Sequence, residues 1–329
     1  MQIHCTSHNQ DATSQMAEKP ITTRRLAADE KGIAEAAAIL RAGGLVAFPT
    51  ETVYGLGADA TNGEAVARIY AAKGRPSFNP LIVHVCDIDM ADRIGVIVGE
   101  ARDLVQECWP EPVTIVVPLR EDAMVSELVT AGQPSVALRM PKSDIALALI
   151  RETGRPLAAP SANPSGRVSA TTAEHVLAGL DGKIDAVIDG GPTPVGLEST
   201  IIGFLDDKPR LLREGAFSVT LPDIRIDAGV AEKPVAPGQL ASHYAPLASV
   251  RLNATKAEPG EFLLGFGDVK GDLTLSAEGS LTEAAANLYA MLHEIDARGV
   301  TRLAVAPIPD ESLGRAINDR LRRAAAPRD

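Results

Sequence analysis

"KGRPSFNPLIVHV" (residues 73–85) is the stretch of sequence that decides the fold class. A turn with two cations, one Gly and two Pro leads into the run 81–85, which shows no polar–apolar alternation. Such a run predicts a strand that is covered on both faces, as in a sheet with helices on either side. Lys73 and Arg75 would then lie where a buried strand begins.

Similar short runs recur along the chain, each bounded by Gly, Pro or Asn. They are "GLVAF" (44–48), "VTIVVP" (113–118), "SVALRM" (135–140), "PLAAP" (156–160), "AVID" (186–189) and "STIIGF" (199–204). Helical patterns lie between several of them, at 63–72, 144–152 and 172–180. We expect Asp144 to cap the second helix, and Thr171 or Thr172 to cap the third. Strands that alternate with helices predict an α/β layer fold.

The organisation of the sequence changes after residue 217. Residues 221–246 contain four prolines and little periodicity, which is typical of a linker. Beyond it, strand patterns at 248–253, 261–266 and 302–307 alternate with helical patterns at 281–298 and 311–325, which predicts a small second α/β domain. The predicted parts are a flexible extension (1–20), a first α/β domain (21–220), the linker (221–246) and the second domain (247–329).

Composition and charge exclude several classes of function. The 329 residues carry 32 basic and 43 acidic side chains, and this net charge of -11 argues against a general polyanion-binding protein. It does not exclude one local basic pocket. The three cysteines show no CxxC spacing, so neither a zinc site nor a disulfide framework is predicted. The apolar runs are shorter than a membrane span and no signal peptide is visible, so we expect a cytoplasmic protein without a membrane contact.

Several segments carry groups that suit an anionic ligand. Arg139 interrupts an apolar strand, and a buried guanidinium needs a carboxylate neighbour or an anionic ligand. "AAPSANPSGRVSATT" (158–172) places hydroxyl and amide groups around Gly166 before a helix, which favours an anion cradle, although a loop with an N-cap is the competing interpretation. Taken alone, Lys73 and Arg75 are more often a solvated turn, and His84 is more often a core residue.

The stretch "FPTETVYGLGADATN" (48–62) contains two Gly and three Thr. It is neither a Walker A loop nor a dinucleotide fingerprint, and a tight turn capped by Thr side chains is one interpretation of it. Ligands of open α/β sheets bind where several strand ends converge. We therefore expect Lys73, Arg75 and Arg139 to meet the 158–172 loop in one polyphosphate or carboxylate site.

Taken in order, these segments resemble the threonylcarbamoyl-AMP synthases of tRNA modification, whose catalytic domain is YrdC-like. The matching pieces are "FPTETVYGLG", "KGRPSFNPLIVHV", "WPEPVTIVVP", "VALRMP", "APSANPSG" and "ESTII". They extend from about residue 40 to 217, and "SHYAP" (242–246) is similar to the long form with an additional C-terminal domain. The resemblance implies a twisted open sheet in the first domain and a smaller Rossmann-like second domain.

The resemblance also implies an activity. In that family, L-threonine, bicarbonate and ATP give threonylcarbamoyl-adenylate, pyrophosphate and water. Downstream transferase machinery then modifies the adenosine beside the anticodon of ANN-decoding tRNAs. Such a nucleotidyl transfer needs positioning and charge neutralisation more than a protein nucleophile, so the lack of a Ser–His–Asp pattern is expected. Mg²⁺ would accompany ATP, but no Asp/Glu cluster in the motifs forms a metal site of its own.

Site residues follow from the resemblance, motif by motif. The residues expected around L-threonine are Thr52, His84, Arg139 and Ser199. Those expected to contact ATP are Arg75, Asn79, Ser135, Ser161, Asn163, Thr171, Arg213 and Tyr244. Lys73 and Arg75 are expected to be catalytic, by neutralising phosphates or holding bicarbonate. His243 and Tyr244 would belong to a linker lid over the ATP.

Three alternatives remain at this stage. An RNA-binding module is disfavoured by the acidic balance and by the lack of an aromatic platform, although a weak tRNA contact is compatible with the sequence. A different carbamoyl transferase that shares the domain would usually bring zinc-finger and kinase-like modules, for which there are neither CxxC pairs nor spare length. The third alternative is a regulatory anion-binding domain without catalysis.

Overall fold

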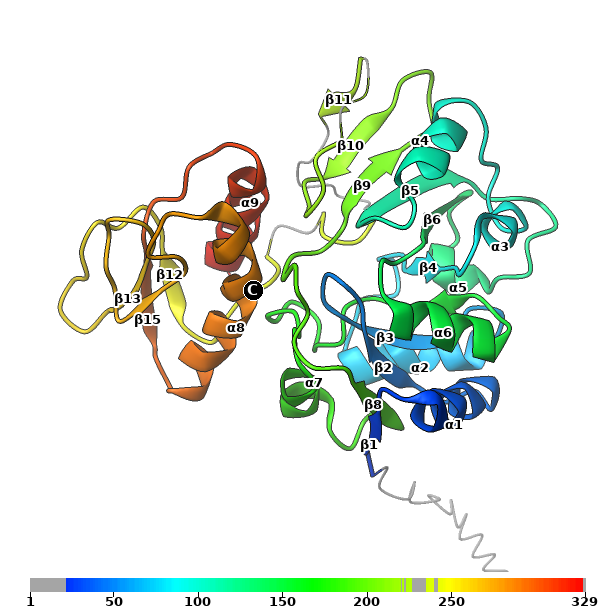
Figure 1. The fold of residues 1–329 in the computed structure, drawn as a ribbon, viewed down its shortest axis with the longest axis horizontal. Coiled ribbons are helices and arrows are strands. Elements are labelled where there is room, and N and C mark those ends of the chain that lie inside the picture. Colours follow the sequence, from blue (N-terminus) through cyan, green and yellow to red (C-terminus); the bar gives the residue numbers. More distant parts are fainter. Residues whose placement is uncertain (1–21, 220, 222, 227–234, 240–241, 328–329) are drawn as a thin grey trace, which may run out of the picture.

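The computed structural model describes residues 22–219, 221, 223–226, 235–239 and 242–327. The predicted extension (1–20) lies outside these residues, as do parts of the predicted linker (221–246). Figure 1 shows two layered units, a larger one and a smaller one, joined through residues of the linker. The two-domain organisation that the sequence predicts is therefore visible in the described part of the chain.

One mixed sheet runs through the larger unit. Its eleven described strands have the order β1-β8-β2-β3-β7-β4-β6-β5-β9-β10-β11. In chain order they are β1 (Arg24–Ala27), β2 (Val46–Pro49), β3 (Tyr54–Asp59), β4 (Ile82–His84), β5 (Val113–Pro118), β6 (Ser135–Arg139), β7 (Leu157–Ala158), β8 (Ala186–Asp189), β9 (Thr200–Gly203), β10 (Arg210–Arg213) and β11 (Arg225–Ile226). The tight turn proposed for 48–62 is confined to residues 50–53, because β2 and β3 pair antiparallel on either side of it.

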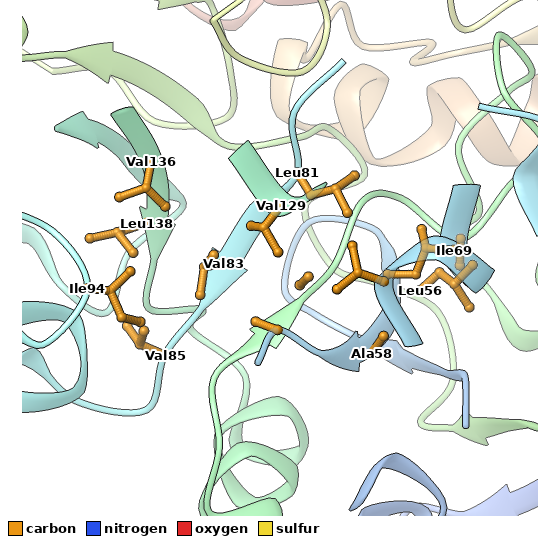
Figure 2. Close-up of a cluster of buried hydrophobic side chains, with 14 of the residues drawn as sticks. Leu56, Ala58, Ile69, Leu81, Val83, Val85, Ile94, Val129, Val136 and Leu138 are labelled. Atoms are coloured by element: carbon orange, nitrogen blue, oxygen red, sulfur yellow. The ribbon is translucent and has the colours of Figure 1, made fainter. Parts of the chain in front are cut away.

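Helices cover both faces of this sheet, as the apolar runs predict. They are α1 (Glu30–Arg41), α2 (Gly63–Lys73), α3 (Ile88–Asp92), α4 (Glu100–Cys108), α5 (Glu127–Thr130), α6 (Asp144–Thr153) and α7 (Ala173–Leu180). Within β2, Ala47 belongs to one buried cluster and Val46 and Phe48 to another, so successive side chains enter opposite cores. Figure 2 shows part of the first cluster, where Val83 of β4 packs among residues of neighbouring strands and helices.

The helices α6 and α7 each begin at a side chain that caps the first turn, but the cap of α6 differs from the predicted residue. Thr172 caps α7, as one of the two predicted residues, and its side chain accepts from the His175 amide. The prediction of Asp144 as the cap of α6 is wrong by one residue. Ser143 is the cap, and Asp144 is the first helical residue, where its negative charge suits the helix dipole.

The smaller unit is a parallel four-stranded sheet, as its strand–helix alternation predicts. Its described strands have the order β12-β15-β13-β14, with bounds β12 (Ser249–Arg251), β13 (Phe262–Gly265), β14 (Leu273–Thr274) and β15 (Arg302–Val305). Two helices, α8 (Leu281–Ala297) and α9 (Leu313–Ala325), lie on the side of this sheet that faces the larger unit (Figure 1). The smaller α/β domain with a parallel sheet that the resemblance implies is confirmed.

The two units share one hydrophobic cluster. Leu288 and Leu292 of α8 pack in the same cluster as Val53, Val168 and Leu197 of the larger unit. Gly196, at φ 75°, allows this close approach, because a Cβ there would lie 2.5 Å from the carbonyl oxygen of Ala285 in α8. The smaller unit therefore docks tightly against the loop that precedes β9. None of the helices in the described ranges is both long and apolar enough to cross a bilayer.

Candidate active site

A small, partly open pocket lies where β4, β6 and β10 meet the β2–β3 turn, the 158–172 loop and the described linker residues. It leaves about 40 Å³ for the centres of water molecules. Its walls are formed by Thr50, Val53, Gly55, Arg75, Ile82, His84, Arg139, Ala159, Pro160, Ser161, Glu198, Arg213, Pro237, Gly238, His243 and Tyr244. Six residues that the sequence predicts for the site are among them, namely Arg75, His84, Arg139, Ser161, Arg213 and Tyr244.

Arg75 enters the pocket from the turn after α2. Its guanidinium is buried and donates to the carbonyl oxygens of Asn79 (3.2 Å) and Pro80 (2.9 Å) within its own turn. Burial lowers its pKa to about 10, and the charge of Arg213 adds to this effect. Arg75 still carries its proton at neutral pH, so it presents a poorly solvated positive charge that favours an anionic ligand.

Arg139 lies at the end of β6 and has the carboxylate neighbour that its burial demands. Its Nη2 donates to Oε1 of Glu51 at 2.6 Å and to Oγ1 of Thr52 at 2.8 Å. Thr52 in turn shares a hydrogen bond of 2.8 Å with Thr50. The Nε of Arg139 has no hydrogen-bond partner among the residues that the structure describes, although it is buried. One edge of this guanidinium can therefore accept an anionic group without losing an existing bond.

Arg213 comes from β10 and joins the pocket to the linker. It donates to the backbone oxygen of Ser199 (2.9 Å from Nη2) and to that of Pro237 (3.2 Å from Nη1). Gly238, at φ 91°, makes this contact feasible, because a Cβ there would lie 2.8 Å from both Cδ of Arg213 and the Tyr244 hydroxyl. The predicted threonine contact Ser199 lies behind Arg213, and its hydroxyl meets Thr114 at 2.7 Å.

His84 is a neutral, unsatisfied group in the pocket wall. Its Nδ1 is buried without a hydrogen-bond partner in the described residues. Burial lowers its pKa to about 3, and the neighbouring charge of Arg139 acts in the same direction. A buried polar nitrogen without a partner is costly, so His84 is suited to a ligand that fills the gap.

Lys73 does not line the pocket, although the sequence predicts it as a catalytic residue. Its buried Nζ donates to the backbone oxygens of Ser161 (2.6 Å) and Asn163, so it holds the 158–172 loop from behind. Burial, with Arg75 as a second cause, lowers its pKa well below the ordinary value. Asn163 is anchored by its Nδ2 to the oxygens of Pro164 and Arg167, and its buried Oδ1 has no partner in the described ranges.

The other predicted residues are buried close to the motifs but outside the pocket wall. Asn79 has no side-chain partner among the described residues, and Ser135 begins β6. The Thr171 hydroxyl meets Nδ1 of His175 at 3.2 Å, at the border with α8 rather than in the pocket. No group of three or more His, Cys, Asp or Glu side chains in the described ranges is arranged to hold a metal ion.

Glu51 and Glu198 are site residues that the sequence did not predict. Glu51 pairs with Arg139. Glu198 lines the pocket from the loop before β9 and pairs with Arg320 of α9 at 2.9 Å. "PTET" and "LEST" each place a Glu beside a Thr or Ser at the end of a strand. This pattern could have identified both Glu residues as candidate partners for the buried arginines. Nothing in the local sequence around residue 320 points to the pocket.

Fold and site together define a two-domain α/β protein whose arginine-lined pocket suits an anionic ligand. The chain matches the Sua5–YciO–YrdC family, described as telomere recombination, over residues 38–215. It matches the family described as threonylcarbamoyl-AMP synthase, C-terminal domain, over residues 215–326. The chain belongs to the threonylcarbamoyl-AMP synthase family, in its long form.

Full-length relatives agree with this assignment. The threonylcarbamoyl-AMP synthase of Bacillus subtilis is 42% identical, over 93% of this chain and 96% of that protein. The one of Pyrococcus abyssi is 40% identical, over 90% and 95%. The crystal structure of P. abyssi Sua5 complexed with L-threonine superposes with a TM-score of 0.85 and 38% identity, covering 93% of this chain and 97% of that one. The similarity thus includes both domains.

Proposed function

We propose that the chain is a nucleotidyltransferase that makes threonylcarbamoyl-AMP from L-threonine, bicarbonate and ATP, and that releases pyrophosphate and water. The observation that carries the proposal is the convergence of Arg75, Arg139 and Arg213 with the unsatisfied His84 in one small pocket. These groups suit a ligand set with a carboxylate, a carbamate and a triphosphate. A protein of this fold has been crystallised with L-threonine, which supports a site for this amino acid here.

The chemistry requires no protein nucleophile. The threonine amine attacks bicarbonate, and loss of water gives a carbamate. A carbamate oxygen then attacks the α-phosphorus of ATP, and the bond from that phosphorus to the bridging oxygen breaks to release pyrophosphate. Negative charge gathers on the phosphoryl oxygens, where fixed cations stabilise it most. Mg²⁺ enters with ATP as part of the substrate.

We assign the roles of the pocket residues by position. Arg139, whose Nε is unpaired among the described residues, and His84 face the space nearest β4 and β6, and they would receive the threonine carboxylate and hydroxyl. Arg75 and Arg213 lie toward the linker and would receive the phosphates. Lys73 acts indirectly in this scheme, because it fixes the loop carbonyls of Ser161 and Asn163.

The linker must move for ATP to enter. A space of about 40 Å³ holds about three water molecules, which is far too little for a nucleotide. Pro237, Gly238, His243 and Tyr244 close the side of the pocket that Arg213 faces. These described linker residues therefore support the lid that the sequence predicts. One solved structure is of a P. abyssi Sua5 variant in which adjacent His and Tyr residues are both replaced by Ala.

The product is a reactive mixed anhydride, so we propose that transferase machinery in the cytoplasm consumes it to modify tRNA. The decisive test supplies ATP, radiolabelled bicarbonate and each amino acid in turn. Label should appear in a short-lived adenylate only with L-threonine, with pyrophosphate released in equal amount. Equal labelling with alanine or serine, or pyrophosphate release without bicarbonate, would contradict the proposal. Arg139→Gln serves as the matched variant, and should lose most of the threonine-dependent signal.

A further inference from the structure

The carboxylate of Glu198 belongs to the pocket wall of the first domain, but the second domain supplies most of its partners. Arg320 of α9 donates from Nε to Oε2 at 2.9 Å. Tyr289 of α8 donates to the same oxygen at 2.9 Å and lies 3.1 Å from Oε1. Ser169 of the first domain donates to Oε1 at 2.6 Å. Both oxygens are thereby satisfied, and two of the three donors come from the smaller unit.

Arg320 is fully buried and also shapes the lid. It is 1% exposed, which is an unusual position for a guanidinium. Its Nη2 donates to the backbone oxygen of Glu214 at 2.9 Å, and its guanidinium carbon lies 5.0 Å from the ring centre of Tyr244. Tyr244 also stacks on Tyr289, with ring centres 5.9 Å apart. The helices of the second domain therefore contact both the pocket carboxylate and the linker tyrosine.

The charge of Glu198 is unfavourable for the proposed reaction unless it is neutralised. Glu198 and Arg213 line the same small pocket, where the phosphates of ATP are expected. A bare carboxylate there would repel a triphosphate, because electrostatic interactions are strong in a poorly solvated site. A carboxylate whose charge is offset by Arg320 presents a nearly neutral wall and leaves Arg75 and Arg213 free to attract phosphate.

We propose that Arg320, assisted by Tyr289, is a positioning residue of the active site: it neutralises Glu198 and fixes Tyr244 on the pocket wall that the nucleotide meets. The second domain thus completes the ATP site through buried contacts rather than acting as a separate module. The inference rests on the proposed use of ATP. It names the residues outside the catalytic domain that ATP binding requires.

Several charged groups face Glu198 and set its protonation. Burial acts to raise the pKa of the carboxyl, but Arg320, Arg213 and the hydrogen bonds overcome this effect and lower it to about 2. The remaining titratable neighbours are Asp319 on α9, Tyr289 on α8, and His243 and Tyr244 on the linker. Without Arg320, burial is opposed by fewer partners, and the pKa of Glu198 rises.

The test measures ATP binding to the full chain by calorimetry at pH 8 and pH 6. Arg320→Gln should weaken ATP binding about tenfold relative to wild type at pH 8, because an unpaired carboxylate then faces the phosphates. At pH 6 the deficit relative to wild type at the same pH should be smaller than at pH 8, because the loss of Arg320 raises the pKa of Glu198 and a larger fraction of the carboxyl takes up a proton. Adding Glu198→Gln to Arg320→Gln should restore wild-type affinity to within about twofold at both pH values, because the carboxylate that lines the pocket is then replaced by a neutral amide.

Arg322→Gln is the matched control, because Arg322 is exposed on the same helix and should bind ATP as the wild type does. A merely structural role for Arg320 would give a deficit that is equal at both pH values and that Glu198→Gln does not relieve. That outcome would overturn the proposal. So would an Arg320→Gln variant that binds ATP with wild-type affinity.

Tyr289→Phe keeps the proposal testable if Arg320→Gln does not fold. It removes only the hydroxyl that donates to Glu198 and keeps the ring packed, so ATP binding at pH 8 should weaken about threefold. An unchanged affinity in this variant would count against the proposal. Threonine-dependent pyrophosphate release by the wild type is assayed separately. If that assay fails while ATP binding follows the expected pattern, the proposed function is wrong and the role of Arg320 stands.

Discussion

Gly196→Ala probes the docking of the two domains with a single methyl group. Gly196 lies at φ 75°, and its added Cβ would meet the backbone of α8 at 2.5 Å (Ala285 O), 2.6 Å (Ala286 Cα) and 2.8 Å (Ala286 O). An ordinary contact starts near 3.4 Å, so α8 must retreat by about 0.9 Å, the difference between 3.4 and 2.5 Å. Backbone atoms cannot turn aside as a flexible side chain can. The helix that carries Tyr289 must therefore move as a whole.

The magnitude has two parts that can be separated. A left-handed backbone costs a non-glycine residue about 1–2 kcal/mol. Overpacking of a tight contact adds about 1–3 kcal/mol. Gly191 is the matched control, because it has φ 76° and nothing within 4 Å of its would-be Cβ. Gly191→Ala should therefore cost only the backbone part, and Gly196→Ala both parts.

Urea unfolding followed by circular dichroism gives the change in unfolding free energy of each variant. We expect Gly196→Ala to be destabilised by about 1–3 kcal/mol more than Gly191→Ala, which is the overpacking part alone. Pyrophosphate release should fall in Gly196→Ala only, since the displaced α8 withdraws the Tyr289 hydroxyl from Glu198. Equal urea midpoints and equal rates of pyrophosphate release in the two variants would refute the reasoning, because the domains would then not be in close contact at this loop.

Three further outcomes are expected. Arg139→Ala should raise the KM for threonine roughly 10- to 100-fold, because the threonine carboxylate loses the guanidinium that binds it. An unchanged KM would argue against the assignment of Arg139 to threonine binding. His84→Gln should make the protein less sensitive to acid. The buried imidazole has its pKa lowered to about 3, so only the unfolded state takes up a proton as the pH falls below about 6.5, and stability is full above that pH and lost toward pH 3. Urea midpoints measured from pH 7 to 4 should therefore decline less steeply in His84→Gln than in wild type. Deleting residues 242–329 should lower ATP turnover by about tenfold or more, since Glu198 loses Arg320 and Tyr289, and full activity in the truncated protein would show that the second domain is dispensable.

The strands that could be predicted from the sequence are those with uninterrupted apolar runs. "VTIVVP" and "AVID" coincide with β5 and β8 residue for residue, because both faces of these strands are buried and Gly or Pro residues bound them. β3 was not predicted as a strand, because "YGLGAD" reads as a turn. Its glycines serve packing instead, since a Cβ at Gly57 would lie 2.7 Å from the Phe48 ring.

In the site, the sequence predicts the cations but not their partners. Arg139 stands out locally because it interrupts an apolar strand, whereas its partner Glu51 is 88 residues away along the chain. Arg320 and Glu198 are 122 residues apart and in different domains, so only the fold brings them together. The sequence predicts Lys73 in the pocket together with Arg75, because the two residues belong to the same turn. As the last residue of α2, however, it turns its ammonium toward the loop carbonyls, two residues before the chain reaches the pocket wall.

The small volume of the pocket has a kinetic consequence. Since about 40 Å³ admits only a few water molecules, we expect nucleotide to bind productively only after the described linker residues rearrange. The observed rate of association should therefore level off at high ATP concentration, at a plateau equal to the rate at which the linker opens. The same barrier slows the reverse passage, so a labile anhydride formed inside would spend its lifetime shielded from bulk water until the linker lets it leave.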